Sequence, residues 1–213
     1  MYKDDPRNEI TYSSKGRIKY VRNRSKKPLP VSPATNLQEA RRLWVFILPV
    51  IVGTSTPTLQ DLKDFLNTHQ KIWLFLTSKT SYTGKYEHKC IAFQVLDSQE
   101  SEYTLAEFYE YHLLWEYYKL YANISMVQQG SKRYPVMDVG KTKGAPGIRY
   151  TLQLWDPNDR CAVRTYNEGG NTECQLHIWH EAVRRNVTKC KNTFKKHCPK
   201  RKHRVFYYKT CAG

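Results

Sequence analysis

Eight segments of the chain alternate apolar and polar residues with the period of two that is typical of β-strands. Turn-forming pairs such as Thr83-Gly84, Gly130-Ser131 and Gly169-Gly170 separate most of them. Eight short strands at hairpin spacing predict an all-β fold, an eight-stranded antiparallel barrel that is wide enough to hold one small ligand. An immunoglobulin-like sandwich fits less well, because its two cysteines flank a central tryptophan and the cysteines here come late in the chain. The predicted strands span residues 71–78, 88–97, 103–111, 115–124, 134–139, 147–155, 161–167 and 174–181.

Two segments repeat their apolar residues at helical spacing instead. The first begins at Pro57-Thr58 and carries Asp61 and Asp64 in its first turn, where the helix dipole favours anions. The second, residues 182–197, has one narrow apolar stripe among lysines and arginines, so we expect it to pack on the outside of the barrel. Its stripe consists of Val183, Val187, Cys190 and Phe194. Residues 205–211 are expected to be extended.

An apolar run at residues 43–52 (LWVFILPVIV) follows Arg41-Arg42 and precedes the small residues Gly53, Thr54 and Ser55. This pattern predicts a secretory signal segment over 43–55. A buried strand is the alternative, and a membrane span would need about 20 apolar residues. Residues 1–42 read as a disordered basic leader, which is either an authentic extension or the product of a wrong first exon. The binding domain is therefore expected to span residues 56–213.

The net charge of +16 lies at the two ends of the chain. Residues 182–213 hold 11 Lys/Arg and no acidic residue, whereas residues 56–181 hold 13 Lys/Arg against 15 Asp/Glu. The binding domain itself is therefore close to neutral, which argues against nucleic acid as its partner. The basic tail favours heparin-like glycans, with a solvated helix face as the alternative. Its candidate polyanion-binding residues are Lys195, Lys196, Lys200, Arg201, Lys202 and Arg204.

The six cysteines show no metal-ligand spacing, so they predict disulfides and an extracellular, secreted protein. His177 and His180 would face opposite sides of a strand, so we expect no metal site that they share. The sequence has no phosphate-binding loop, nucleophile elbow or catalytic triad, so we expect neither an enzyme nor a cofactor. Asn123-Ile-Ser and Asn186-Val-Thr are candidate glycosylation sites, and Asn23-Arg-Ser would count only if the leader were retained.

The segment CQLHIWHE (174–181) directs Gln175, His177 and Trp179 to one face of a strand. A barrel interior built from these groups suits a polar, partly aromatic guest. Four aromatic residues on other strands could stack on that guest or form core, and three glutamates in Tyr- and Trp-rich strands could pair with an amine or face solvent. These candidates are Trp73, Phe75, Tyr117 and Tyr121, and Glu107, Glu110 and Glu116.

The order of motifs over residues 58–211 resembles the tick salivary lipocalins, the histamine-binding protein group. The matching segments are an N-terminal helix, KIWLFLTS, SYTGKYEHKCIAF, a late CAV, CQLHIW, a Cys-bearing helix and a terminal Cys. The resemblance implies a secreted monomeric barrel that sequesters a host mediator such as histamine, serotonin or a leukotriene and so suppresses host inflammatory and haemostatic defence. It also implies the disulfides Cys90–Cys211 and Cys161–Cys190, which leaves Cys174 and Cys198 as the third pair.

The sequence departs from the amine-binding signature of that family, which has carboxylates at the positions of Ala162 and Gln175. A buried protonated amine needs a partner charge, and a neutral amide cannot supply one. We therefore expect this amine site to be weak or absent. Arg149 or Arg164 near the substituted positions would suit the alternative guest, a fatty acid or leukotriene whose carboxylate pairs with a cation.

Overall fold

The computed structural model describes residues 56–199, 203–204, 206 and 208–211, so the predicted leader (1–42) and signal segment (43–55) lie outside the described residues. The first elements are α1 (Leu59–Leu66), β1 (Ile72–Thr77), β2 (Tyr82–Thr83), β3 (Tyr86–Glu87), β4 (Lys89–Gln99), β5 (Glu102–Tyr111) and β6 (Leu114–Gln129). The chain continues with β7 (Lys132–Gly140), β8 (Ile148–Asp156), β9 (Cys161–Glu168), β10 (Asn171–Trp179), the 3-10 helix η1 (His180–Ala182), α2 (Thr188–His197), β11 (His203–Arg204) and α3 (Tyr208–Cys211).

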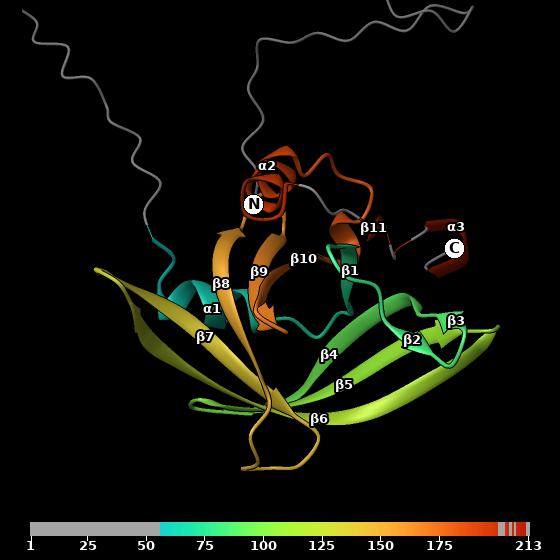
Figure 1. Ribbon diagram of the computed structural model, residues 1–213, viewed down its shortest axis with the longest axis horizontal. Helices are drawn as coiled ribbons and strands as arrows, with labels where there is room; N and C mark the ends of the chain where they lie inside the picture. Colours follow the sequence, from blue (N-terminus) through green and yellow to red (C-terminus); the bar gives the residue numbers. More distant parts are fainter. Residues whose placement is uncertain (1–55, 200–202, 205, 207, 212–213) are drawn as a thin grey trace, which may run out of the picture. The chain divides into compact units, whose positions relative to one another are not determined.

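The eight long strands form a closed antiparallel barrel (Figure 1). Their order is β1-β4-β5-β6-β7-β8-β9-β10, and β10 pairs back onto β1, with Ile72 opposite Trp179. The predicted eight-stranded antiparallel barrel is thus confirmed. Because the barrel is closed, each of these strands pairs with a neighbour on both sides and none has a free edge. The short β2 and β3 form a separate hairpin that the sequence pattern did not predict.

The helix α1 closes one end of the barrel. Its start is fixed by a capping box, in which Thr58 Oγ1 accepts a hydrogen bond from the Asp61 amide (3.1 Å) and the Asp61 carboxylate accepts one from the Thr58 amide (2.7 Å). The helix packs against β6, β7 and β8 and buries Leu62, Phe65 and Leu66 in the inner core. The Phe65 ring lies 5.6 Å from that of Trp155 near the end of β8, so α1 forms the floor of the barrel.

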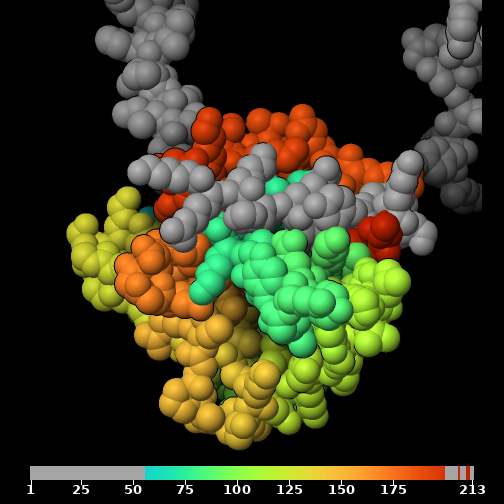
Figure 2. Space-filling view, turned by 45° about the vertical axis from the view of Figure 1, so that its right-hand side comes forward, coloured from blue at the N-terminus to red at the C-terminus, as the bar shows by residue number. Residues whose placement is uncertain are grey.

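The opposite end, called here the open end, carries the turn between β5 and β6, the loop at residues 141–147 between β7 and β8, and the turn between β9 and β10. This placement follows from the antiparallel order, because successive connections alternate between the two ends. Figure 2 shows these connections on one face of the molecule together with the blue-green β2–β3 hairpin.

The helix α2 covers the outside of the barrel over β8, β9 and β10. Of the predicted apolar stripe, Val187, Cys190 and Phe194 are buried, whereas Val183 precedes the helix and is half-buried. Two disulfides, Cys161–Cys190 and Cys174–Cys198, join this helix and the residue after it to β9 and β10. The third disulfide, Cys90–Cys211, joins the start of β4 to α3. These are the two pairs that the family resemblance implies and the remaining third pair.

Two element boundaries differ from the prediction. The second helix was expected from residue 182, but a 3-10 turn precedes it and α2 begins at Thr188. The cause is that His180 is held on β1: its amide donates to the Lys71 carbonyl (3.0 Å) and its ring accepts from the Trp73 indole (3.0 Å). The expected extended end at 205–211 is also wrong in part, because Tyr208–Cys211 forms one helical turn that ends at the disulfide to Cys90.

Candidate ligand-binding cavity

The barrel encloses a cavity of about 550 Å³ beneath the β7–β8 loop. All eight long strands contribute to its lining, and its size is typical of small-molecule sites. One wall is apolar and the facing wall, on β9 and β10, is polar. The apolar wall includes Phe93, Leu105, Leu120, Met137 and Val139, and the polar wall consists of Arg164, Gln175 and His177.

The polar wall is a hydrogen-bonded cluster. Arg164 and Gln175 are direct cross-strand partners, and Arg164 Nη2 donates to Gln175 Oε1 (3.0 Å) and to His177 Nε2 (2.8 Å). Because Nε2 accepts, the proton of the neutral imidazole is on Nδ1. Burial, together with the charge of Arg164, holds the pKa of His177 well below its ordinary value. His177 is therefore neutral near pH 7 and presents an N–H group.

The guanidinium of Arg164 carries a buried charge. The residue is 4% exposed, and burial lowers its pKa to about 10, so it stays protonated near neutral pH. Among the described residues no carboxylate lies within ion-pairing distance of its guanidinium. The rings of Tyr150 (4.5 Å) and Phe93 (5.3 Å) flank the guanidinium and offset only part of its desolvation.

Three buried side-chain nitrogens in the described part of the chain have no hydrogen-bond partner: Trp155 Nε1, Arg164 Nε and His177 Nδ1. All three residues surround Phe65, whose ring centroid lies 5.6 Å from the Trp155 ring, 6.1 Å from the His177 ring and 6.0 Å from the Arg164 guanidinium carbon. Buried donors of this kind are normally paired. The deep part of the barrel thus offers unpaired N–H groups and no matching acceptor from the described residues.

Glu107 of β5 also lines the cavity. Burial raises its pKa above the ordinary value, against the opposing effect of Arg164 and of Lys141 at the mouth. Burial likewise raises the pKa of Tyr150. Since both groups are shifted toward their neutral forms, the guanidinium is the charge that dominates the interior.

Of the ten predicted ligand-binding residues, the cavity brings together Glu107, Gln175 and His177. Trp179 points to the same side of β10 but lies beneath the cavity, where its indole nitrogen donates to the Phe65 carbonyl (3.0 Å). It belongs to the floor and not to the lining.

The prediction for Trp73 and Phe75 is wrong, because both lie on the outer face of β1. Both faces of β1 are covered, so all six of its residues are buried and alternation does not reveal the inner side. The cavity receives Leu74 instead. The two aromatic rings pack outside the barrel against Phe206, at 5.0 Å and 6.1 Å.

Four further predicted residues also lie outside the cavity. Glu110 is an odd number of positions from Glu107 on β5 and so takes the other face. Glu116 accepts a hydrogen bond from the Tyr111 hydroxyl (3.2 Å). Tyr117 is 54% exposed, and Tyr121 lines a groove on the outer wall.

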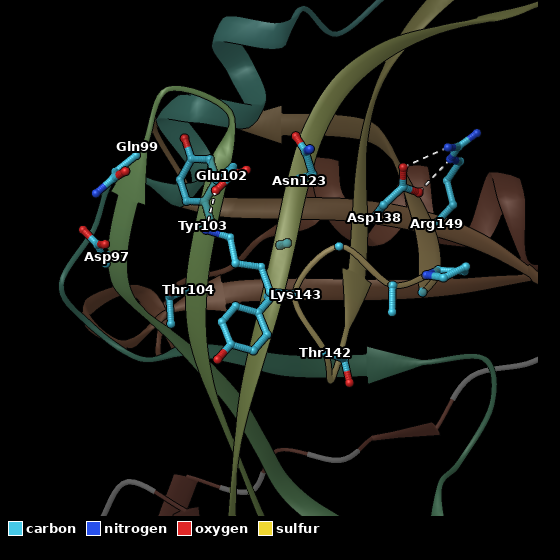
Figure 3. A pocket seen from close by; sticks show the side chains of 16 residues that line it. Asp97, Gln99, Glu102, Tyr103, Thr104, Asn123, Asp138, Thr142, Lys143 and Arg149 are labelled. Carbon is cyan, nitrogen blue, oxygen red and sulfur yellow. Dashed lines mark hydrogen bonds and ion pairs between the residues drawn. The ribbon is translucent and has the colours of Figure 1, made fainter.

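That outer groove, about 690 Å³, lies between β5, β6 and the β7–β8 loop (Figure 3). Its charged groups pair with one another: Arg149 holds Asp138 through two hydrogen bonds (2.7 and 2.8 Å), and Lys143 pairs with Glu102 (2.9 Å). Arg149 is therefore not available to a guest in the barrel, and of the two predicted cations only Arg164 faces the cavity. Exposed pairs of this kind are already satisfied and do not call for a ligand.

The loop at residues 141–147 is the wall shared by the groove and the cavity, with Thr142, Ala145, Pro146 and Gly147 lining both. Gly147 must be glycine here, because a Cβ atom would stand 2.1 Å from the Val139 carbonyl oxygen. The loop is thereby held close against the end of β7.

The remaining predicted sites are only partly described. Asn123 on β6 and Asn186 before α2 are both exposed, and their glycosylation stays a prediction. Lys195 and Lys196 are exposed on α2, whereas Lys200, Arg201, Lys202 and the side chain of Arg204 lie outside the description, so polyanion binding also stays a prediction. No helix of the described residues is long and apolar enough to cross a membrane, and no metal-binding cluster of His, Cys, Asp or Glu occurs among them.

A closed eight-stranded antiparallel barrel around a ligand-sized cavity, with a helix at its floor and another on its outer wall, defines a lipocalin-like ligand-binding protein. The chain belongs to the tick histamine binding protein family, since the model of that family matches residues 54–213. Its members are ligand-binding proteins and not enzymes. Three disulfides fit an extracellular protein.

Among solved structures the chain is similar to Japanin from Rhipicephalus appendiculatus bound to cholesterol. The two share 17% sequence identity with a TM-score of 0.47, and the match covers 66% of this chain and 93% of Japanin. Comparison with curated proteins gives no match.

Proposed function

We propose that the protein sequesters a small amphiphile of the fatty-acid type, with its carboxylate against Arg164 and its hydrocarbon part against the apolar wall. The observation that carries this proposal is a buried guanidinium that faces a cavity and has no carboxylate partner among the described residues. An isolated buried charge is costly, and a ligand carboxylate would offset that cost through a charge-assisted hydrogen bond.

The unpaired donors support the same head group. A carboxylate accepts several hydrogen bonds and donates none, which suits Arg164 Nε and His177 Nδ1. Leu105, Leu120 and Met137 then offer the hydrocarbon part a continuous apolar surface. A lipid mediator such as a leukotriene has both features.

A biogenic amine such as histamine is the second candidate, and Glu107 is the observation that favours it. This carboxylate lies in the cavity, as an amine site requires. Arg164 in the same cavity opposes a cationic guest, and burial shifts Glu107 toward its neutral form. We therefore place the acidic ligand first.

The biological role that we propose follows from the family. The protein would be secreted in saliva and would remove a host mediator from the wound, which lowers the host's inflammatory or haemostatic response. The three disulfides and the enclosed cavity support a role outside the cell.

The decisive experiment is calorimetric titration of the purified protein with arachidonate, a leukotriene, histamine and serotonin in parallel. We expect heat of binding from the two acids and none from the two amines. Tight binding of an amine with no response to either acid would contradict the proposal and favour Glu107 as the ligand's partner.

The pH dependence of binding separates the two candidates. As the pH rises through the raised pKa of Glu107, this residue becomes anionic and repels a carboxylate ligand, so affinity should fall by about 1 kcal/mol, or roughly fivefold. Arg164 stays charged, while His177 and Tyr150 stay neutral, between about pH 6 and 9. Titration of arachidonate across this range measures the slope.

The variant Glu107→Gln should remove the slope and bind at least as tightly as the unsubstituted protein at the alkaline end. An amine ligand predicts the opposite sign, since it would gain affinity as Glu107 ionises. Affinity that rises with pH would therefore contradict the acidic ligand.

A further inference from the structure

The turn between β5 and β6 exposes a group of large apolar side chains. Tyr111 and Leu114 are the last paired residues, so the connection is the two-residue turn His112-Leu113. Leu113 is 87% exposed, Leu114 56% and Trp115 50%. Tyr117, on the same strand, is exposed as well. We call residues 112–117 the hairpin tip.

This exposure is concentrated and not scattered. Seven large hydrophobic residues are exposed in the described part of the chain, and four of them lie in the hairpin tip. Single exposed apolar residues need no explanation, but a contiguous group marks a site of interaction.

The backbone of the tip is strained in a way that keeps Leu113 outside. His112 and Leu113 have positive φ values of 48° and 64°, a conformation that Asn and Gly adopt readily and that leucine disfavours. The tip is nevertheless held in place, because the His112 ring stacks on Tyr86 of β3 at 4.2 Å. A strained turn that presents a bulky apolar side chain to water is a recurring property of functional sites.

Cationic side chains surround the tip. Lys71 Nζ lies 5.6 Å from the Trp115 ring, and Lys85, Lys89 and Lys119 are exposed on the neighbouring strands and hairpin. The nearby carboxylates of Glu87, Glu110 and Glu116 are half-buried. Leucine and tryptophan within a set of lysines match the interfacial zone of a bilayer, where apolar groups insert and ammonium groups meet anionic lipids.

By the order of the strands the tip also lies at the open end of the barrel, the end at which the β7–β8 loop and Lys141 border the cavity. In Figure 1 the β5–β6 hairpin ends at the right of the view, beside the β2–β3 hairpin. A membrane that contacts the tip would therefore face the same end of the barrel as the mouth of the cavity.

We propose that the hairpin tip docks the protein on a phospholipid bilayer through Leu113, Leu114 and Trp115, with the surrounding lysines on anionic head groups. A convex two-residue turn suits insertion into a fluid interface better than the broad, matched surface that a protein partner requires. This docking does not depend on which ligand the cavity binds. It would bring the mouth of the cavity to a surface from which a lipid can enter.

The test is sedimentation of the full chain with vesicles of phosphatidylcholine, with and without phosphatidylserine. We expect binding that increases with phosphatidylserine and that falls about tenfold or more in Leu113→Gly. Because glycine adopts positive φ without strain, the same variant should unfold at a higher temperature than the unsubstituted protein, so lost binding is not lost folding.

Leu96→Ser is the matched control, since Leu96 is an exposed leucine (51%) on β4 outside the tip, and we expect its vesicle binding to be unchanged. Either of two results would overturn the proposal: no sedimentation with any of the vesicles, or equal sedimentation of Leu113→Gly and the unsubstituted chain. The second result would assign membrane binding to the basic leader and the basic tail alone.

Discussion

Replacing Arg164 by methionine is expected to abolish measurable binding of a carboxylate ligand while the barrel stays folded. Loss of a desolvated, hydrogen-bonded charge pair costs about 2–5 kcal/mol, which is at least about 30-fold in affinity. Arg164 is buried without a carboxylate partner in the described residues, so an apolar side chain of similar length removes a desolvation cost. This gain offsets the two hydrogen bonds lost to Gln175 and His177, and the free energy of unfolding should therefore change little. Calorimetry with arachidonate and thermal unfolding of the same sample measure both quantities.

Arg149→Met is the matched control, because Arg149 lies outside the barrel in an exposed pair with Asp138. Its affinity for the ligand should equal that of the unsubstituted protein. If Arg164→Met binds arachidonate as tightly as this control, the guanidinium does not hold the ligand and the acidic head group is the wrong assignment.

The second large effect is expected from the disulfide Cys90–Cys211. Replacing both cysteines by alanine should lower the free energy of unfolding by about 4–5 kcal/mol, since this bridge closes a loop of 121 residues. For a chain of this size the midpoint of thermal unfolding should fall by about 10–20 °C. The bridge also ends the segment that brings Phe206 over Trp73 and Phe75, so its loss should expose these rings.

The double variant that removes Cys174–Cys198 provides the comparison. That bridge closes only 24 residues, which corresponds to about 3 kcal/mol. Circular dichroism during heating under non-reducing conditions ranks the two variants. A larger loss from the shorter loop would show that packing beneath α2, and not restriction of the unfolded chain, decides their stability.

The sequence predicted the barrel because its eight strands carry their own local signals. Alternation on β10 placed Gln175, His177 and Trp179 on the inner side, and the turn residues Gly169-Gly170 have the positive φ values that such a turn needs. The β2–β3 hairpin was missed because two-residue strands are too short for a periodic pattern.

The site was less predictable, because a strand that is covered on its outer side has apolar residues on both faces. The sequence pattern then does not show which face points into the barrel. Trp73 and Phe75 look as suitable for a cavity as Leu74, and only their cover by the C-terminal segment decides the side. On β8 the register with β9 shifts between Leu152 and Leu154, which brings Trp155 to the inside. Alternation counted along the sequence cannot anticipate such a shift.

Lys141, Tyr150 and Trp155 are among the contributors to the interior that were not singled out. Tyr150 could have been found from alternation. It lies on the opposite face of its strand from Arg149 and Thr151, and one of these two faces must point into the barrel. Lys141 lies on a loop, where side chains do not alternate regularly, so the sequence pattern cannot predict which way it points. The sequence identified Arg164 and Arg149 as candidate cations. It could not show which of them faces the cavity, because that depends on the register of β8 against β7 and β9.

The closely packed, tilted indoles of Trp155 and Trp179 on the barrel floor have an optical consequence. Their ring centroids are 5.3 Å apart at 37°, and the Arg160 guanidinium lies 4.8 Å from the Trp179 ring. Two chromophores this close couple their electronic transitions and give a paired band in the ultraviolet dichroism spectrum. Because Phe65 packs against Trp155 beneath the cavity, a guest that presses on this floor would alter the coupling, and occupancy can then be followed from the unlabelled protein itself.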